Sequence, residues 1–271
     1  MVEKELGVIE DTLFVPLLGR IYASENFPSI LYDKKALGLK SRLPQHITSN
    51  DTQTQYTYLA SASRSADMDR RIADFLQRKP DGVIVELGVG LETTYYRMDN
   101  GHTHWYGVDL PHVIAYRRNL LPEPPRETYI GCDAFQTDWL NEVRKNYPDA
   151  PLLITASGFF YYFEESQILS LIRMLRGHGD IELLFDAVNK SGMTMMRRKY
   201  MKTIGHADAK MFFYVNSAKE FAAKVGGVSV IAEEPFYRDI DKTGLGFVTK
   251  ISMWIADWCG MVKIVQLQIE S

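Results

Sequence analysis

The segment Val83–Thr94 constrains the fold of this chain more than any other. It reads VIVELGVGLETT, an apolar strand that runs into a turn with two glycines. A second apolar run, His104–Asp109, follows and ends on a carboxylate. A strand, a glycine turn, a helix and a second strand that ends in an acid can place a nucleoside-containing ligand at the carboxyl edge of a parallel sheet. The sequence therefore predicts an α/β protein with such a site.

Apolar runs alternate with amphipathic segments from residue 83 onward. Helices are expected at Pro111–Leu121, Phe163–Leu175 and Ser217–Val225. Strands are expected at Val83–Leu87, His104–Val108, Thr128–Gly131, Leu152–Ala156, Ile181–Val188, Val228–Ile231 and Phe247–Trp254. This alternation predicts a doubly wound, mostly parallel, Rossmann-like sheet of seven strands. No helix-length segment is predicted between the last two strands, so the last strand is expected to be antiparallel.

The chain is expected to form one domain over residues 1–271. Its parts are a helical N-terminal cap (1–80), a cofactor-binding core (81–190), a helical insertion (191–215) and a closing helix with antiparallel strands (216–271). In the cap, Ser61–Leu76 carries apolar residues at helical spacing. A length of 271 residues with 46% hydrophobic content is enough for one large α/β domain.

Composition excludes several classes of protein. No apolar stretch is long enough to cross a membrane, and the acidic start lacks the features of a secretory signal. Cys132 and Cys259 have neither a disulfide pattern nor metal-ligand spacing, which fits the cytoplasm. The net charge of −3 gives no indication of nucleic acid as a partner. His102, His104 and His112 have no evident co-ligands, so no metal is predicted.

The glycine turn favours S-adenosylmethionine over a dinucleotide. Thr93 stands where a dinucleotide fingerprint has a third small residue, and Glu86 and Glu92 would repel a diphosphate. A sulfonium and an ammonium tolerate these acids, and Asp109 can accept the ribose hydroxyls. An antiparallel last strand is also usual in methyltransferases of this class. Two alternatives stay open, an NAD-dependent oxidoreductase and a cofactor-binding protein without methyltransferase activity.

Several motifs resemble the leucine carboxyl methyltransferase family, in its bacterial polyketide O-methyltransferase branch of the tetracenomycin type. They are Glu86–Thr93, Trp105–Pro111 with Arg117, Thr12-Leu13 with Arg20, Ile30–Ala36, Arg64 before Asp69, Asp133, Asp138–Leu140 and Gly158–Phe163. The resemblance covers most of the chain. It implies the fold of class I S-adenosylmethionine-dependent methyltransferases and O-methylation of a small molecule. The oxygen that receives the methyl group would belong to a carboxylate or to a polyketide-type hydroxyl.

The resemblance also implies the residues that bind the cofactor, namely Arg20, Arg64, Glu86, Gly88, Gly90, Asp109, Leu110, Asp133, Ala134 and Ser157. Arg64 would pair with the methionyl carboxylate and Asp109 would hold the ribose. Asp133 and Ala134 would meet the adenine. Ser157 departs from the family, which usually has an acid there, so the cofactor contact or the substrate pocket is expected to differ.

No catalytic residue can be assigned from the sequence, but candidates exist. Tyr161 and Tyr162 lie in an aromatic cluster that could face the substrate, and His206 lies in the predicted insertion. Arg198 and Tyr200 could bind an acidic substrate. The ordinary alternatives are core packing and a helix lead-in for Tyr161 and Tyr162, and a charged helix face for Arg198 and Tyr200. For His206 the alternative is an exposed loop, which is the favoured interpretation. The insertion region also contains five methionines that could form an adaptable apolar cover, namely Met193, Met195, Met196, Met201 and Met211.

The sequence does not identify the group that accepts the methyl, which is either a carboxylate or a hydroxyl. A carboxylate is already ionised at neutral pH and needs no general base, whereas a phenol with a pKa near 10 would be helped by one. The sequence has no evident histidine–acid pair, which fits carboxylate methylation. The oligomeric state is not indicated.

Overall fold

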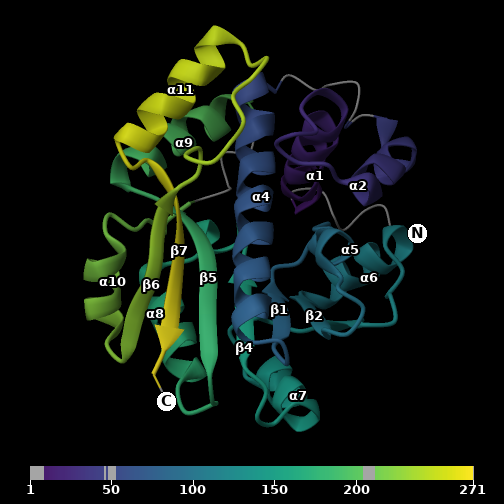
Figure 1. The fold of residues 1–271 in the computed structure, drawn as a ribbon, viewed down its shortest axis with the longest axis vertical. Coiled ribbons are helices and arrows are strands. Elements are labelled where there is room, and N and C mark those ends of the chain that lie inside the picture. Colours follow the sequence, from purple (N-terminus) through teal and green to yellow (C-terminus); the bar gives the residue numbers. More distant parts are fainter. Residues whose placement is uncertain (1–8, 46, 48–52, 204–210, 271) are drawn as a thin grey trace.

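The structure is a computed structural model that describes residues 9–45, 47, 53–203 and 211–270. Within these residues the chain forms a seven-stranded sheet in the order β3-β2-β1-β4-β5-β7-β6 (Figure 1). The strands are β1 (Val83–Leu87), β2 (Trp105–Asp109), β3 (Glu127–Gly131), β4 (Leu152–Ala156), β5 (Ile181–Val188), β6 (Val228–Pro235) and β7 (Val262–Ile269). This is the predicted doubly wound sheet.

Strands β1 to β5 pair in parallel, and β7 runs antiparallel between β5 and β6. Every residue of β1 and β4 is buried, as expected for central strands covered on both faces. The carboxyl ends of β1, β2, β4 and β5 therefore meet at one edge of the sheet. That edge carries the glycine turn after β1, and Asp109, the last residue of β2.

Helices cover both faces of the sheet. They are α1 (Ile9–Asn26), α2 (Lys34–Leu39), α4 (Gln55–Arg78), α5 (Thr94–Met98), α6 (Pro111–Leu120), α7 (Asp138–Asn146), α8 (Glu165–Leu175), α9 (Lys190–Thr203), α10 (Ala218–Val225) and α11 (Phe247–Trp258), with short 3-10 turns η1 (Lys40–Arg42) and η2 (Phe160–Tyr162). Apolar residues of α7, α8 and α10 pack on one face, and those of α4 and α11 pack on the other.

The prediction of a strand at Phe247–Trp254 is wrong, because this segment is the first part of helix α11. Its valine, threonine and isoleucines favour a strand locally, but large side chains recur at helical spacing up to Trp258. The closing strand is β7, which the sequence analysis did not assign. The predicted antiparallel last strand is confirmed, although a helix does separate β6 from β7.

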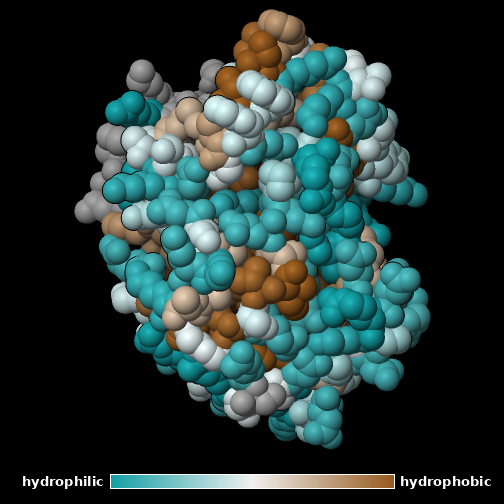
Figure 2. All heavy atoms as spheres, turned by 60° about the vertical axis from the view of Figure 1, so that its left-hand side comes forward, coloured by the Kyte–Doolittle hydropathy of each residue, from teal (hydrophilic) through white to brown (hydrophobic). Residues whose placement is uncertain are grey.

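Helix α11 presents much of its apolar surface to solvent. Phe247, Val248 and Trp258 are each 77% exposed, whereas Met253 and Ala256 are buried against the sheet. Figure 2 shows apolar side chains at the top of the molecule, where Figure 1 places this helix. None of the described helices combines the length and apolar character needed to cross a bilayer.

The N-terminal helices lie over the carboxyl edge of the sheet. Figure 1 shows α1 and α2 beside the upper half of α4. A buried ionic network joins them to the glycine turn, since Arg20 of α1 pairs with Glu92 and Arg97 of α5 pairs with Asp33, Asp69 and Glu92. These contacts hold the N-terminal helices where they can form one wall of a site.

Candidate active site

A cavity of about 590 Å³ opens at the carboxyl edge of the sheet. Its walls come from α1 and α4, the glycine turn, the ends of β2, β4 and β5, and helix α9. This is the place where an open α/β sheet binds its ligand, at the point where the strand order reverses. Strand β1 has β2 on one side and β4 on the other, so the reversal lies beside the glycine turn.

The turn after β1 requires glycine at two positions. Gly88 has φ +65° and Gly90 has φ +43°, a region that side chains strongly disfavour. A Cβ at Gly88 would also collide with the ring of Phe159, and one at Gly90 would lie 2.8 Å from Leu13 Cδ2. Both glycines line the cavity, so the backbone itself forms the surface that a ligand would touch.

Asp109 closes β2 at the cavity wall, beside the glycine turn. One carboxylate oxygen accepts a hydrogen bond from Gly90 N at 2.8 Å, and the other accepts one from Leu110 N at 2.8 Å. Burial raises the pKa of this carboxyl, while the two backbone N–H groups favour the ionised form. Each oxygen keeps a lone pair for a hydroxyl donor, as ribose recognition requires.

Glu92 directly follows the glycine turn and is strongly ionised. Burial opposes its charge, but Arg20 and Arg97 outweigh that cost and lower its pKa to about 2. Arg20 Nη1 is 2.9 Å from Glu92 Oε2, and Arg97 Nη1 is 3.2 Å from Glu92 Oε1. Arg20 and Glu92 both line the cavity, yet each already has a charged partner.

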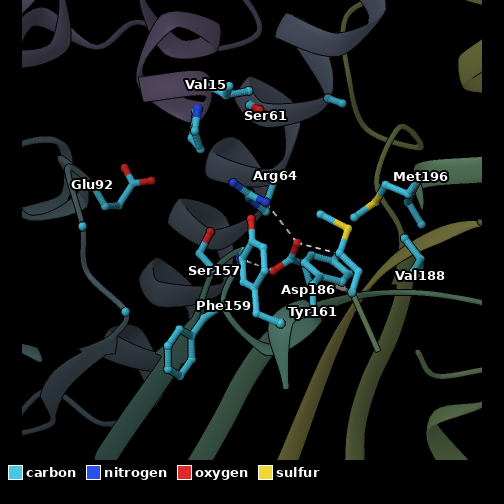
Figure 3. Close-up of a pocket in the computed structure, with 18 of the residues that line it drawn as sticks. Val15, Ser61, Arg64, Glu92, Ser157, Phe159, Tyr161, Asp186, Val188 and Met196 are labelled. Atoms are coloured by element: carbon cyan, nitrogen blue, oxygen red, sulfur yellow. Dashed lines mark hydrogen bonds and ion pairs between the residues drawn. The ribbon is translucent and has the colours of Figure 1, made fainter. Parts of the chain in front are cut away.

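A second charged cluster lies in the cavity wall and is seen at the centre of Figure 3. Asp186 of β5 accepts hydrogen bonds from Tyr161 Oη at 2.8 Å, Gly158 N at 2.6 Å and Arg64 Nη1 at 3.2 Å. Burial and the adjacent carboxylate raise the pKa of Tyr161 well above its ordinary value, so this phenol stays protonated. Arg64 and Asp186 form an ion pair that is almost fully removed from solvent.

Figure 3 shows Glu92 and Ser157 on one side of this cluster and Val188 and Met196 on the other. The second side is apolar, because Val188 and Met196 cluster with Met211 and Tyr162. Met195 and Phe236 also line the cavity. Of the other methionines noted in the sequence, Met193 packs beneath this wall with Val188. The side chain of Met201 lies outside the described residues. The cavity thus has one side near the glycine turn and one side suited to an apolar molecule.

The residues present fit S-adenosylmethionine. The glycine backbone and Asp109 suit the nucleoside, as described above. Near them, the buried Ser157 Oγ and Arg64 Nε have no hydrogen-bond partner among the described residues. Buried polar atoms are nearly always paired in folded proteins, so two such atoms in one cavity wall point to a polar ligand.

A model of the leucine carboxyl methyltransferase family matches residues 5–176, more than half of the chain. The chain belongs to the leucine carboxyl methyltransferase family. The tetracenomycin polyketide synthesis O-methyltransferase TcmP of Streptomyces glaucescens is 27% identical over 258 residues, which cover 89% of this chain and 92% of that protein. Family and relative together identify an S-adenosylmethionine-dependent methyltransferase, as the sequence predicted.

Solved structures share the fold. A DUF574 family protein from Streptomyces avermitilis has a TM-score of 0.59 at 12% identity, covering 94% of this chain and 97% of that one. The magnesium protoporphyrin IX methyltransferase of Synechocystis PCC 6803, solved with bound S-adenosylhomocysteine, has a TM-score of 0.50 at 11% identity, covering 81% and 90%. These likenesses confirm the predicted class I methyltransferase fold.

Most of the predicted cofactor residues of this methyltransferase meet at the cavity. Its wall includes Arg20, Arg64, Gly88, Gly90, Asp109, Leu110 and Ser157. Glu86, Asp133 and Ala134 are not part of the wall as described. Glu86 is buried behind the turn. Asp133 is exposed just after β3, where its carboxylate accepts a hydrogen bond from Phe135 N at 2.9 Å.

Of the predicted catalytic and substrate-binding residues, some line the cavity and others do not. Tyr161 and Tyr162 line the cavity through η2. Arg198 is exposed on α9 and is not among the described cavity residues. The side chain of Tyr200 and all of His206 lie outside the described residues. Thus Arg198 is not brought to the site, and Tyr200 and His206 stay untested.

Asp186 is the functional candidate that sequence reasoning missed. A signal was present, because Asp186 is a charged residue inside the otherwise apolar run Leu183–Val188. Burying a carboxylate is costly unless it is paired, so an acid in such a strand indicates a specific partner. The partners, Arg64 and Tyr161, are far from it in sequence, and only the fold brings them together.

Proposed function

We propose that this methyltransferase methylates a carboxylate oxygen of an apolar small molecule. When bound, S-adenosylmethionine would supply an electrophilic methyl group whose sulfur leaves as a neutral thioether. The observation that carries the proposal is that each carboxylate described in the cavity wall already accepts hydrogen bonds, and Tyr161 is held protonated. An acceptor that arrives ionised needs no side chain to take its proton.

The chain's own residues would then act by binding the methyl donor and aligning the acceptor with its methyl group. We propose that Gly88, Gly90 and Asp109 hold the nucleoside, and that Arg20, Arg64, Leu110 and Ser157 complete the binding surface. Asp133 and Ala134 would meet the adenine from the loop after β3. Alignment of reacting atoms and exclusion of water supply much of the rate enhancement in such displacements.

The apolar side of the cavity would hold the body of the acceptor. Met195, Met196 and Met211 offer flexible, polarizable side chains that adapt to a flat or irregular molecule. The name of the relative TcmP couples O-methylation to polyketide synthesis. A polyketide-type acid fits this apolar surface, so we propose that class of acceptor.

The chemistry of the product tests the proposal. The enzyme would be incubated with S-adenosylmethionine carrying a labelled methyl group and a panel of aromatic acids, each matched with the phenol of the same ring system. We expect label in the acids only, as methyl esters that release labelled methanol in mild alkali. Alkali-stable label in the phenols, with none in the acids, would show that the enzyme methylates hydroxyls instead.

A further inference from the structure

The methyl donor has an amino-acid end with one positive and one negative group, and the cavity offers three carboxylates that could meet the positive one. They are Glu92, Asp109 and Asp186. Glu92 is held between two arginines, Arg20 and Arg97. Two arginines already contact Glu92, whereas Asp186 pairs with one, so Glu92 is the poorer partner for an ammonium.

Asp109 is also unsuited to this task. Its oxygens accept from Gly90 N and Leu110 N at the end of β2, which places the carboxylate at the nucleoside side of the turn. Asp186 lies in another place, on β5. The pairing of Ala156 with Phe185 puts the next residues along, Ser157 and Asp186, side by side at the carboxyl edge.

Asp186 has room for one more hydrogen-bond donor. An ionised carboxylate offers about four acceptor sites, and three are taken by Gly158 N, Tyr161 Oη and Arg64. Ser157 Oγ, on the neighbouring strand, is buried without a described partner and can also accept. An ammonium between these two residues would satisfy both.

Arg64 supplies the opposite charge in the same cluster. It lies 3.2 Å from Asp186 through Nη1, and its buried Nε has no described partner. The guanidinium can therefore bind a carboxylate while it stays paired with Asp186. An arginine and an aspartate side by side in a cavity wall match the two charges of an α-amino acid.

We infer that Asp186 completes, with Arg64, the receptor for the zwitterionic amino-acid end of the methyl donor. Asp186 and Ser157 would hold the ammonium, while Arg64 takes the carboxylate that the family resemblance already assigns to it. The inference rests on the methyl donor and not on the identity of the acceptor. It assigns a binding role to Asp186 and places the negative charge on β5, whereas residue 157 at the end of β4 is an uncharged serine.

The test compares two ligands that differ only at this end. S-Adenosylhomocysteine carries the amino acid, and 5′-methylthioadenosine has the same nucleoside and sulfur without it. Calorimetry would measure both with wild type and Asp186→Asn. We expect the variant to bind S-adenosylhomocysteine roughly 10- to 100-fold more weakly and 5′-methylthioadenosine unchanged. Equal weakening of both ligands, or of neither, would overturn the inference.

Three further variants keep the result interpretable. Asp109→Asn should weaken both ligands alike, because it acts at the nucleoside. Arg64→Gln should repeat the selective loss through the carboxylate. Ser157→Ala, which changes the other proposed ammonium partner, tests the ammonium site if Asp186→Asn does not fold, as judged by thermal unfolding. Binding of S-adenosylhomocysteine to wild type tests the donor separately, and the ester assay tests the acceptor, so failure of one proposal is distinguishable from failure of another.

Discussion

Glu86 shows how burial sets the state of a single residue. It lies in β1, is 5% exposed and has a carboxylate oxygen without a described partner. Burial, reinforced by Glu127 and Glu92, raises its pKa to about 8. The side chain is therefore protonated in the folded protein at neutral pH, although it is ionised in the unfolded chain. This difference makes stability depend on pH.

We expect Glu86→Gln to stabilise the protein under alkaline conditions. Because the folded pKa lies above the unfolded value of about 4.3, the wild type loses stability as pH rises from there to about 8. Glutamine stays neutral and removes that loss. Urea denaturation should show the variant more stable by roughly 3–5 kcal/mol at about pH 8, and close to wild type at about pH 4. The same difference at both pH values would contradict this account.

At the scale of elements, one ionic network joins α1, α4, α5 and the glycine turn. Its centre is Arg97, which binds Asp69 through two hydrogen bonds of 2.7 and 2.9 Å and contacts Asp33 at 2.6 Å. Arg97 is 7% exposed, so its charge and those of its partners are largely desolvated. Such a network contributes little when complete but is costly to leave half-made.

Arg97→Met should therefore destabilise the fold by about 3–5 kcal/mol, because three carboxylates would lose their shared cation. The matched control is Lys224→Met, which removes an exposed pair with Glu165 between α10 and α8. We expect it to cost about 1 kcal/mol or less. Urea denaturation of the two variants measures both effects. Similar stability of the two would mean that the network does not hold the N-terminal helices in place.

At the scale of the whole molecule, the cavity exists only because distant segments converge. Its wall combines residues of α1 and α4 with the ends of three strands and residues of α9. A ligand held by all of these parts binds the folded state and has no site in the unfolded chain. Binding should therefore stabilise the whole fold.

S-Adenosylhomocysteine at about 100 times its Kd should stabilise the protein by about 2.7 kcal/mol, equivalent to an increase of roughly 5–10 °C in Tm. NAD at the same concentration should leave Tm unchanged, because the turn has Thr93 where a dinucleotide site needs a smaller residue. Scanning calorimetry measures both ligands. A shift with NAD and none with S-adenosylhomocysteine would point back to an oxidoreductase.

The sequence by itself determined the order of the elements and the place of the site. Strand and helix alternation predicted the sheet, and the glycine turn with Asp109 predicted its binding edge, because these signals are local in the chain. The strand predicted at Phe247–Trp254 is wrong because β-branched residues favour a strand locally. The segment is a helix because the helical conformation buries Met253 and Ala256 in the core.

Only the tertiary structure decided which charges meet. Arg64 and Asp186 are 122 residues apart, and nothing local pairs them. The neutral state of Glu86 likewise depends on how deeply β1 is covered. Burial, pairing and pKa arise from through-space contacts between segments that the sheet topology brings together, so chain order alone cannot specify them.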